Sequence, residues 1–497
     1  MSADISLGVF SLLPPLIAIA LALITRQVFL ALFVGLWIGY VILASGNPLM
    51  GSFETLNAFV NVFSDAGNTR IIIFTLIVGA LIALIQRSGG VQGFVDHLLK
   101  VLQNKTGKTQ ASPPSRMQRR KLELLALLTG FILFIESNIS ILTVGTLYRP
   151  LFDRLKIPRE KLAFITDSGS APSCILIPFN AWGAFITGLL IAQNIENPFG
   201  TLLGATLFNV YPILVILILI FVILSGRDIG EMQQAEIRAL ETGALLRPGA
   251  RPMMSTQSLD IQPKESLTPR ARYMVIPIAA MVILMPVFLI MTGRESVPAG
   301  SNWLTALQAG SGSTSVLYAT SFATALAMVM NKLSGRLGIR EMFDLSLKAM
   351  SGMLPLALLM VMAFAIGTLC RELGTGTYIA QTLNGLIWPG FLPALIFVSA
   401  CFVAFSTGTS WGTFAIMIPI AVPLALTLDM NTGLMIAAAL GGGIFGDHCS
   451  PTSDTSIITS MATANDHIDH VRTQLPYALI GGAITIVIYL ILGHIYA

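Results

Sequence analysis

Apolar stretches separated by short polar segments run along almost the whole chain. A helix needs about 20 apolar residues to cross the hydrocarbon core of a bilayer, and about 10 to reach its middle. Stretches close to the spanning length occupy residues 28–44, 202–224, 273–291 and 476–495. The pattern therefore predicts an all-α polytopic membrane protein.

The composition supports this class. The chain has 497 residues, of which 54% are hydrophobic and 11% are charged, whereas soluble domains carry about 25% charged residues. The four cysteines lie in or beside apolar stretches and form no CxxC pair, so we expect no disulfide framework. The first eight residues carry no basic side chain, so we expect the first apolar stretch to be a retained span rather than a cleaved signal.

Basic side chains indicate which loops face the cytoplasm. They cluster in residues 100–121 and again in residues 149–161, on both sides of the apolar segment 122–148. A segment with two cytoplasmic flanks should enter the membrane and return, so residues 122–148 are predicted to form a re-entrant hairpin. The polar residues at its tip would be Glu136, Ser137 and Asn138.

A second re-entrant hairpin is predicted over residues 391–428. Its flanks are poor in Lys and Arg, which fits a hairpin that enters from outside. Polar residues interrupt it part-way, and the candidate ligands at its tip are Thr407, Thr409 and Ser410.

Two further apolar segments are predicted to be broken helices. Residues 162–190 are interrupted by the polar run 167–172, Asp-Ser-Gly-Ser-Ala-Pro, and a second polar patch follows at residues 178–183. Residues 433–463 contain the Gly run 441–443 and Pro451, which together predict a break. A break frees backbone N–H and C=O groups, which must then face protein, water or a ligand.

The two halves of the chain match element by element. Residues 1–224 and 271–497 each hold apolar spans, a hairpin with a polar tip and a broken helix, and the polar residues 225–270 join them. The first half is predicted to start outside and the second inside. The chain is therefore predicted to be an inverted-topology repeat, which is typical of secondary transporters. The linker 225–270 would be cytoplasmic, and both termini would be external.

Asp447 and Asp454 lie in the second broken helix at membrane depth. Burying a carboxylate there is costly, so a functional role is the default hypothesis. Carboxylates, freed carbonyls and hydroxyls suit a hard cation such as sodium, and a carboxylate can bind a proton instead. We predict a sodium site at Asp447 and Asp454 that binds either ion but never both. The alternative is that these residues only cap half-helices. His448 is a candidate proton relay, and its alternative role is that of a structural donor.

Asp167 is the repeat counterpart of Asp447 and is expected to contact ion or substrate, with helix capping as the alternative. Glu136 could bind a proton or pair structurally with a basic residue. Helix N-termini at the hairpin tips also attract anions, so a carboxylate substrate stays open. The further candidate ligands in the second broken helix are Ser450, Ser453 and Thr455.

His467 and His470 have a loose metal-like spacing. They fall in a predicted cytoplasmic loop and have no third clear ligand. We expect a solvated surface there rather than a metal site.

Four motifs together resemble those of the NhaC-type sodium/proton antiporters, which belong to an ion-transporter superfamily with two re-entrant hairpins. They are Gly-Asp-His-Cys-Ser-Pro-Thr-Ser-Asp-Thr at 446–455, residues 466–471 with 474–477, residues 405–413, and the Asp167 motif followed by residues 177–183. The resemblance implies sodium and protons as transported ions, no cofactor, a scaffold part and a transport part, elevator motion, and a homodimer. The family includes malate/lactate exchangers coupled to sodium and protons, so the resemblance leaves the substrate open.

We therefore expect a secondary active transporter, and not an enzyme, that exchanges sodium for protons across the bacterial cytoplasmic (inner) membrane. Its partners would be membrane lipid, sodium and protons, with no nucleic acid. One alternative is a sodium- or proton-coupled transporter of a small carboxylate such as malate or lactate, with Asn138 and Thr409 as donors. A distant alternative is an intramembrane hydrolase that uses Asp447, Asp454 or His448. An inverted repeat disfavours the hydrolase, because an enzyme needs no matched access from two sides.

Overall fold

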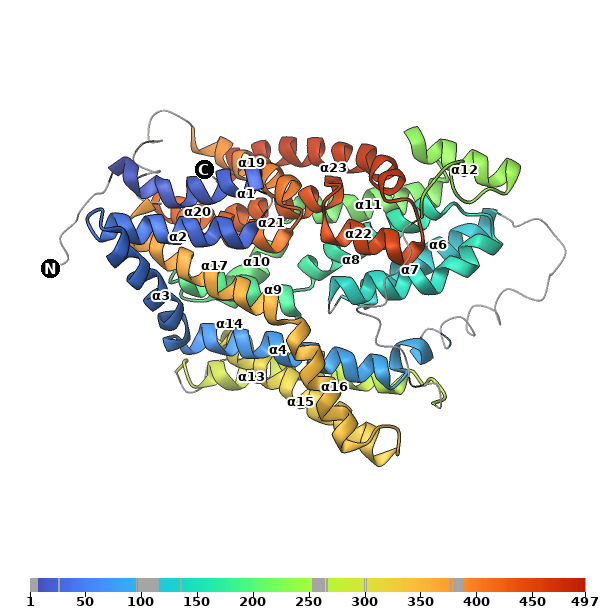
Figure 1. The fold of residues 1–497 in the computed structure, drawn as a ribbon, viewed down its shortest axis with the longest axis horizontal. Coiled ribbons are helices and arrows are strands. Elements are labelled where there is room, and N and C mark those ends of the chain that lie inside the picture. Colours follow the sequence, from blue (N-terminus) through green and yellow to red (C-terminus); the bar gives the residue numbers. More distant parts are fainter. Residues whose placement is uncertain are drawn as a thin grey trace. The chain divides into compact units, whose positions relative to one another are not determined.

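The computed structural model describes residues 8–496, apart from residues 26, 95, 97–115, 135, 253–263, 265–266, 299, 301, 376–377, 379–381 and 383–387. Within this part, the chain forms helices and one isolated β-bridge between Pro252 and Asp466. The predicted all-α class is confirmed. The helices divide into two compact units, and Figure 1 colours them along the sequence.

The larger unit comprises Met1–Ser64, Arg116–Ser255 and Val361–Ala497. Its N-terminal helices are η1 (Gly8–Leu12), α1 (Leu13–Thr25), α2 (Val28–Leu43) and α3 (Pro48–Ser64). The next group is α6 (Arg116–Ile132), α7 (Ser137–Arg154), α8 (Arg159–Leu176), α9 (Ala181–Ala192), α10 (Pro198–Thr206), α11 (Val210–Ser225) and α12 (Gly230–Thr242). The C-terminal group is η2 (Pro389–Phe391), α19 (Leu392–Thr407), α20 (Ser410–Thr427), α21 (Thr432–Cys449), α22 (Asp454–Thr463) and α23 (His467–Tyr496).

The smaller unit comprises Asp65–Ser115 and Thr256–Met360. Its helices are α4 (Ala66–Arg87), α13 (Arg272–Arg294), α14 (Trp303–Gln308), α15 (Gly312–Leu333) and α16 (Ile339–Gly352). Helix α4 packs against α15 and α16, and α13 packs against α15. Helix α17 (Leu354–Glu372) begins in this unit and ends in the larger one.

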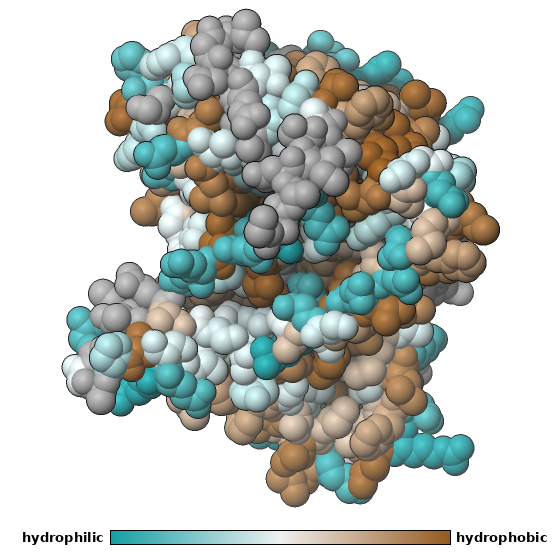
Figure 2. Space-filling view, turned by 90° about the vertical axis from the view of Figure 1, so that its left-hand side faces the viewer, coloured by the Kyte–Doolittle hydropathy of each residue, from teal (hydrophilic) through white to brown (hydrophobic). Residues whose placement is uncertain are grey.

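Eight helices of the described chain are long and apolar enough to cross a membrane, or nine if the bent pair α8–α9 forms one span. Large apolar side chains such as Leu217, Ile283 and Val487 are exposed on them. On the face that Figure 2 presents, hydrophobic side chains are interspersed with hydrophilic ones. The long apolar helices and the apolar side chains exposed on them are suited to lipid, so the protein is a multi-pass membrane protein.

The compact units do not follow the predicted repeat boundaries. The smaller unit joins α4, from residues 1–224, to α13, α15 and α16, from residues 271–497. A repeat is a relation between two stretches of sequence, whereas a compact unit is set by which apolar faces are buried against one another. The division into two inverted repeats therefore stays a prediction.

The linker 225–270 contains an ordered helix. Helix α12 buries Met232, Ala235 and Ala239 and packs against α8 and α23. Its spacing of apolar residues at three and four positions gives one face that can be buried, while its other faces stay polar. This part of the linker is therefore docked on the larger unit.

Helices α19 and α21 pack closely because small residues face one another. Gly442 and Gly446 are four residues apart on one face of α21. A Cβ atom added at Gly442 would lie 2.5 Å from the Cβ atom of Ala400, and one added at Gly446 would overlap Ala404. Such small-residue pairs allow membrane helices to approach closely. The prediction that the Gly run breaks the helix is wrong, because these glycines serve packing inside a continuous α21.

The second broken helix is confirmed, with its break at residues 450–453. Helix α21 ends at Cys449 and α22 begins at Asp454. Pro451 lies in the break, where it has no N–H to continue the helix. The break therefore follows Asp447 by one turn and directly precedes Asp454.

The first broken helix is also confirmed, with its break at the second of its two polar interruptions, residues 178–183, and not at the first. Residues 167–172 lie inside the continuous helix α8, and the chain bends by 45° between α8 and α9, at residues 177–180. Asn180 caps α9 by accepting a hydrogen bond from the Gly183 N–H. Pro172 is tolerated within α8, whereas Pro178 and the Asn180 cap end one helix and start the next.

Both predicted hairpins are pairs of helices with a short break. Helices α6 and α7 contact each other and are separated by residues 133–136, next to the predicted tip. Helices α19 and α20 are separated by residues 408–409. Each of α19 and α20 is apolar and long enough to span a membrane, with α19 taken together with η2. That either pair enters the membrane and returns on the same side stays a prediction.

Candidate functional site

The break between α21 and α22 is held against the turn between α19 and α20. The Ser450 hydroxyl donates a hydrogen bond to the Phe405 carbonyl oxygen over 2.6 Å, and the Asp454 N–H donates to the Gly408 carbonyl oxygen over 3.2 Å. Gly408 has φ of +68°, and a Cβ atom there would overlap the Thr452 carbonyl. Only glycine suits both the conformation and the close approach, so this turn fixes the geometry of the break.

The first break is tied to the first hairpin in a similar way. The Asn180 amide donates hydrogen bonds to the carbonyl oxygens of Phe134, Cys174 and Ile177, over 2.8 to 2.9 Å. Phe134 lies between α6 and α7. One side chain therefore satisfies two carbonyls freed at the end of α8 and one at the hairpin turn.

Asp447 is fully buried near the C-terminal end of α21. Neither of its carboxylate oxygens makes a hydrogen bond of standard geometry. The hydroxyl and the backbone N–H of Ser410, the first residue of α20, face this carboxylate. The N-terminus of a helix favours negative charge, so α20 contributes to the electrostatics of the Asp447 site.

Three carboxylates are close enough for their charges to interact. Asp454 and Asp167 both act electrostatically on Asp447, and Asp167 acts on Asp454. Asp454 is exposed, in contrast to the two buried carboxylates. Two buried carboxylates with a third negative charge nearby are unfavourable without a compensating cation or proton.

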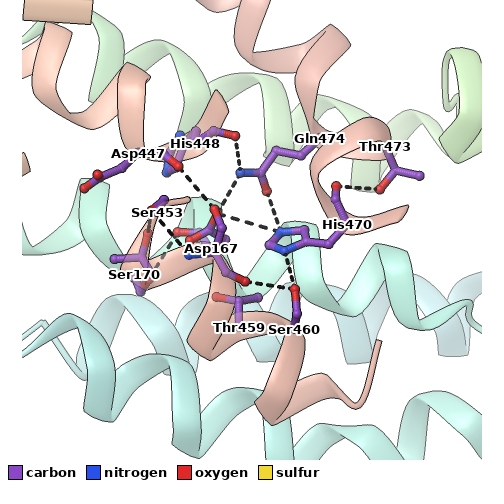
Figure 3. A network of polar contacts seen from close by, with 12 residues as sticks. Asp167, Ser170, Asp447, His448, Ser453, Thr459, Ser460, His470, Thr473 and Gln474 are labelled. Atoms are coloured by element: carbon purple, nitrogen blue, oxygen red, sulfur yellow. Dashed lines mark hydrogen bonds and ion pairs between the residues drawn. The ribbon is translucent and has the colours of Figure 1, made fainter. Parts of the chain in front are cut away.

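Asp167 lies in the middle of α8 and is fully buried. Its Oδ2 atom accepts hydrogen bonds from Gln474 Nε2 over 2.7 Å and from Ser456 Oγ over 3.3 Å. His470 Nε2 is 3.7 Å from the same oxygen, while Oδ1 has no hydrogen-bond partner. Figure 3 shows side chains from α22 and α23 converging on Asp167.

Gln474 joins three parts of this site. Its amide nitrogen also donates to the carbonyl oxygen of His448 over 3.0 Å, and its amide oxygen faces His470 Nε2 at 3.1 Å. Asp167, His448, His470 and Gln474 are each at most 1% exposed. A buried side chain that satisfies all of these groups fixes α8, α21 and α23 together.

The remaining predicted residues lie outside the Gln474 network or contact it only through the backbone. His448 Nδ1 is 3.0 Å from the Tyr211 hydroxyl, while its Nε2 atom has no hydrogen-bond partner. The other contacts stabilise the breaks and the turns: Ser137 and Asn138 donate to Glu136 Oε1, Thr407 donates to the Val403 carbonyl, Thr413 donates to the Thr409 carbonyl, Ser450 contacts Thr452, and Ser453 contacts Thr455.

The prediction that His467 and His470 lie on a solvated surface is wrong for His470. It is fully buried, and both of its ring nitrogens face hydrogen-bond partners. His467 is half-buried at the first turn of α23. The signal that could have revealed this was the spacing of His470 and Gln474, four residues apart and therefore on one helix face.

Comparisons with known proteins agree with this architecture. The model of the family described as "Na+/H+ antiporter family" matches residues 190–494. An uncharacterized protein of Haemophilus influenzae is 31% identical over 99% of this chain and 92% of its own length. The chain belongs to the Na⁺/H⁺ antiporter family. It is therefore a secondary transporter of the sodium/proton exchange class, and not an enzyme.

More distant similarities fit this membership. The "Malate-2H(+)/Na(+)-lactate antiporter" of Bacillus subtilis is 32% identical over 24% of this chain and 28% of its own length. The YdaH transporter of Alcanivorax borkumensis has a similar fold, with a TM-score of 0.54 at 12% identity over 89% of this chain and 88% of that one. At this identity, the YdaH similarity supports the transporter fold alone.

Proposed function

We propose that this antiporter exchanges sodium for protons at a site formed by Asp447, Asp454 and Asp167. The observation that carries the proposal is Asp447, a fully buried carboxylate whose oxygens make no hydrogen bond of standard geometry. An unsatisfied buried carboxylate is costly. Binding a cation or a proton would remove most of that cost, which is the property that a transport site for these ions needs.

Sodium would bind between Asp447 and Asp454. Asp447 lies near the end of α21 and Asp454 is the first residue of α22, so the two lie on opposite sides of the break. The Ser410 hydroxyl faces Asp447. A hard cation takes carboxylate, hydroxyl and carbonyl oxygens as ligands, and broken membrane helices commonly supply them. In the described chain, no three His, Cys, Asp or Glu side chains are arranged to hold a metal ion together, so the hydroxyl and carbonyl oxygens are needed for this site.

The proton would bind Asp167. One of its oxygens has no hydrogen-bond partner, while the other is held by Gln474 and Ser456. Because the charges of Asp167 and Asp447 interact, sodium beside Asp447 would disfavour a proton on Asp167, and loss of sodium would favour it. This coupling gives alternate binding of the two ions, and hence exchange.

The proposal is tested in proteoliposomes that contain a pH-sensitive dye, with the membrane potential clamped. We expect a sodium pulse to change the internal pH with the wild type and not with Asp447→Asn. The matched control is Asp344→Asn, whose side chain is 71% exposed on α16 and which should exchange like the wild type. If active wild-type vesicles do not respond to sodium, or if Asp447→Asn keeps the full response, the proposal is wrong.

The same vesicles test whether a carboxylate is carried instead. The partial similarity to a malate/lactate antiporter makes labelled malate and lactate the appropriate substrates. The site would be assigned to carboxylate transport if sodium drove the uptake of either acid and if no proton response occurred when the acid was left out. We expect no such uptake.

We also propose an inverted repeat, a linker 225–270 in the cytoplasm, external termini, residence in the inner membrane, and a homodimer. The similar attachment of each helix break to a hairpin turn supports the repeat.

The four native cysteines are buried, so a cysteine introduced at exposed Arg251 reports on which side of the membrane the linker lies. We expect a membrane-impermeant maleimide to label Arg251→Cys only after the cells are opened. Ultracentrifugation in lipid nanodiscs tests the dimer.

A further inference from the structure

A chain of polar contacts leads from half-buried His467 to buried Asp167. His467 Nδ1 is 3.1 Å from Ser460 Oγ, and His470 Nδ1 is 3.1 Å from the same oxygen. His470 Nε2 is 3.7 Å from Asp167 Oδ2. Figure 3 shows Ser460, His470 and Asp167 in this order.

The hydrogen-bond partners of the two imidazoles show that Nε2 of each ring carries a hydrogen. Gln474 presents its amide nitrogen to two acceptors, so its oxygen faces His470 Nε2, which must carry a hydrogen. His467 Nε2 is 2.7 Å from the Pro451 carbonyl oxygen and must also carry one. If both rings are neutral, both Nδ1 atoms are acceptors.

Ser460 cannot satisfy all its neighbours with a single hydroxyl hydrogen. Its oxygen lies near the two Nδ1 atoms and also 2.8 Å from the Ser456 carbonyl oxygen. With both rings neutral, these three acceptors compete for one hydrogen. One extra proton on either ring turns its Nδ1 into a donor to Ser460 and so adds a hydrogen bond. The group therefore has a natural place for one mobile proton.

We propose that protons reach Asp167 through His467, Ser460 and His470. This inference rests on the proposed function, because it assigns the path of the proton in sodium/proton exchange. It concerns residues that are separate from the proposed sodium ligands Asp447 and Asp454.

Each transfer breaks one bond to hydrogen and forms another. A proton taken up on His467 Nδ1 passes to Ser460 Oγ, while Ser460 gives its own hydrogen to His470 Nδ1. His470 then gives its Nε2 hydrogen to the Asp167 carboxylate. One proton is added at His467 and one arrives at Asp167, with no net change of charge on either ring. A turn of the His470 ring restores its first tautomer.

Charged groups of both signs face the path. Asp167 on α8 faces His470, and its negative charge favours a proton there, whereas His448 on α21 and His467 on α23 act in the opposite sense when charged. Near the outer end of the path, Asp466 and Asp469 lie on either side of His467 in sequence, and they bind Arg251 and Arg247 of the linker.

The experiment compares two exchange modes in proteoliposomes for the wild type, Ser460→Ala, His470→Gln and His467→Gln. Sodium-driven proton movement needs the path, whereas exchange of radioactive sodium for unlabelled sodium does not. We expect each variant to slow proton movement on the order of tenfold or more, as for loss of a proton-transfer group, while sodium/sodium exchange stays near the wild-type rate. The control is Ser173→Ala, a buried serine whose hydroxyl bonds a carbonyl of its own helix.

A second readout separates proton transfer from a structural role. We expect added imidazole buffer, a small proton carrier, to restore proton movement in His467→Gln, whose site is half-buried. If Ser460→Ala or His470→Gln is too unstable to purify, His467→Gln decides the question. The inference is overturned if proton movement is unchanged in the variants, or if both exchange modes fall equally and imidazole restores nothing. If the wild type itself shows no sodium-driven proton movement, the proposed function fails first.

Discussion

Replacing Gln474 with Met tests whether one buried amide holds the site together. Met keeps the length of the side chain but removes its hydrogen bonds. Gln474 makes one hydrogen bond to the Asp167 carboxylate, one to the His448 carbonyl and one with the His470 ring. After the substitution, Asp167 Oδ2 keeps only the longer hydrogen bond from Ser456.

The expected loss follows from the types of hydrogen bond. A bond to a charged group contributes about 1.5–3 kcal/mol and a neutral one about 0.5–1.5 kcal/mol. The three bonds together therefore contribute about 2.5–6 kcal/mol. We expect a loss of about 3 kcal/mol in the free energy of unfolding, toward the low end, because Ser456 still donates to Asp167 and Met regains some apolar burial.

The measurement is reversible unfolding in mixed micelles, followed by circular dichroism. The control is Leu479→Met, a substitution on the same helix at a side chain that is 52% exposed, which should change stability by less than about 0.5 kcal/mol. A loss below about 1 kcal/mol for Gln474→Met would refute the reasoning, since a single neutral hydrogen bond would account for it.

Three further predictions concern packing and charge. Gly446→Ala should prevent α21 from seating on α19, because the added methyl group overlaps α19; the yield of folded protein in size-exclusion chromatography should fall sharply, and an unchanged yield would contradict the close packing. Asp228→Ala leaves Lys161, which is 2% exposed, without its ion-pair partner. We expect the free energy of unfolding to fall by about 3–5 kcal/mol and to be largely recovered when Lys161 is also replaced by Met. A double variant as unstable as Asp228→Ala would contradict this account. The hydrogen bond from Lys264 lowers the pKa of Glu341 below its usual 4.5. This contact therefore stabilises the fold above that pH, and its contribution is lost as the pH falls through the lowered pKa. The difference in thermal midpoint between wild type and Glu341→Gln should shrink from about pH 6 to about pH 3, and a constant difference would exclude the contact as its source.

The sequence by itself determined the class of protein and the residues of the candidate site. Apolar length, low charge and the motif at 446–455 are local properties, and they led to a multi-pass antiporter with Asp447, Asp454 and Asp167 as its candidate site. Helix breaks could also be predicted in the right segments, because Pro and cap-forming residues act on the backbone within a few positions.

Only the tertiary structure decided what each local feature does. The Gly run 441–443 reads as a helix breaker in isolation, but Gly442 is required in a continuous helix because α19 lies against it. His470 reads as a loop residue, but the burial of α23 against α8 brings it to Asp167. Likewise, Gln474 and Asp167 are 307 residues apart in the chain. Contacts of this kind depend on which helix faces are buried together, and the spacing of residues along one helix does not specify its partner.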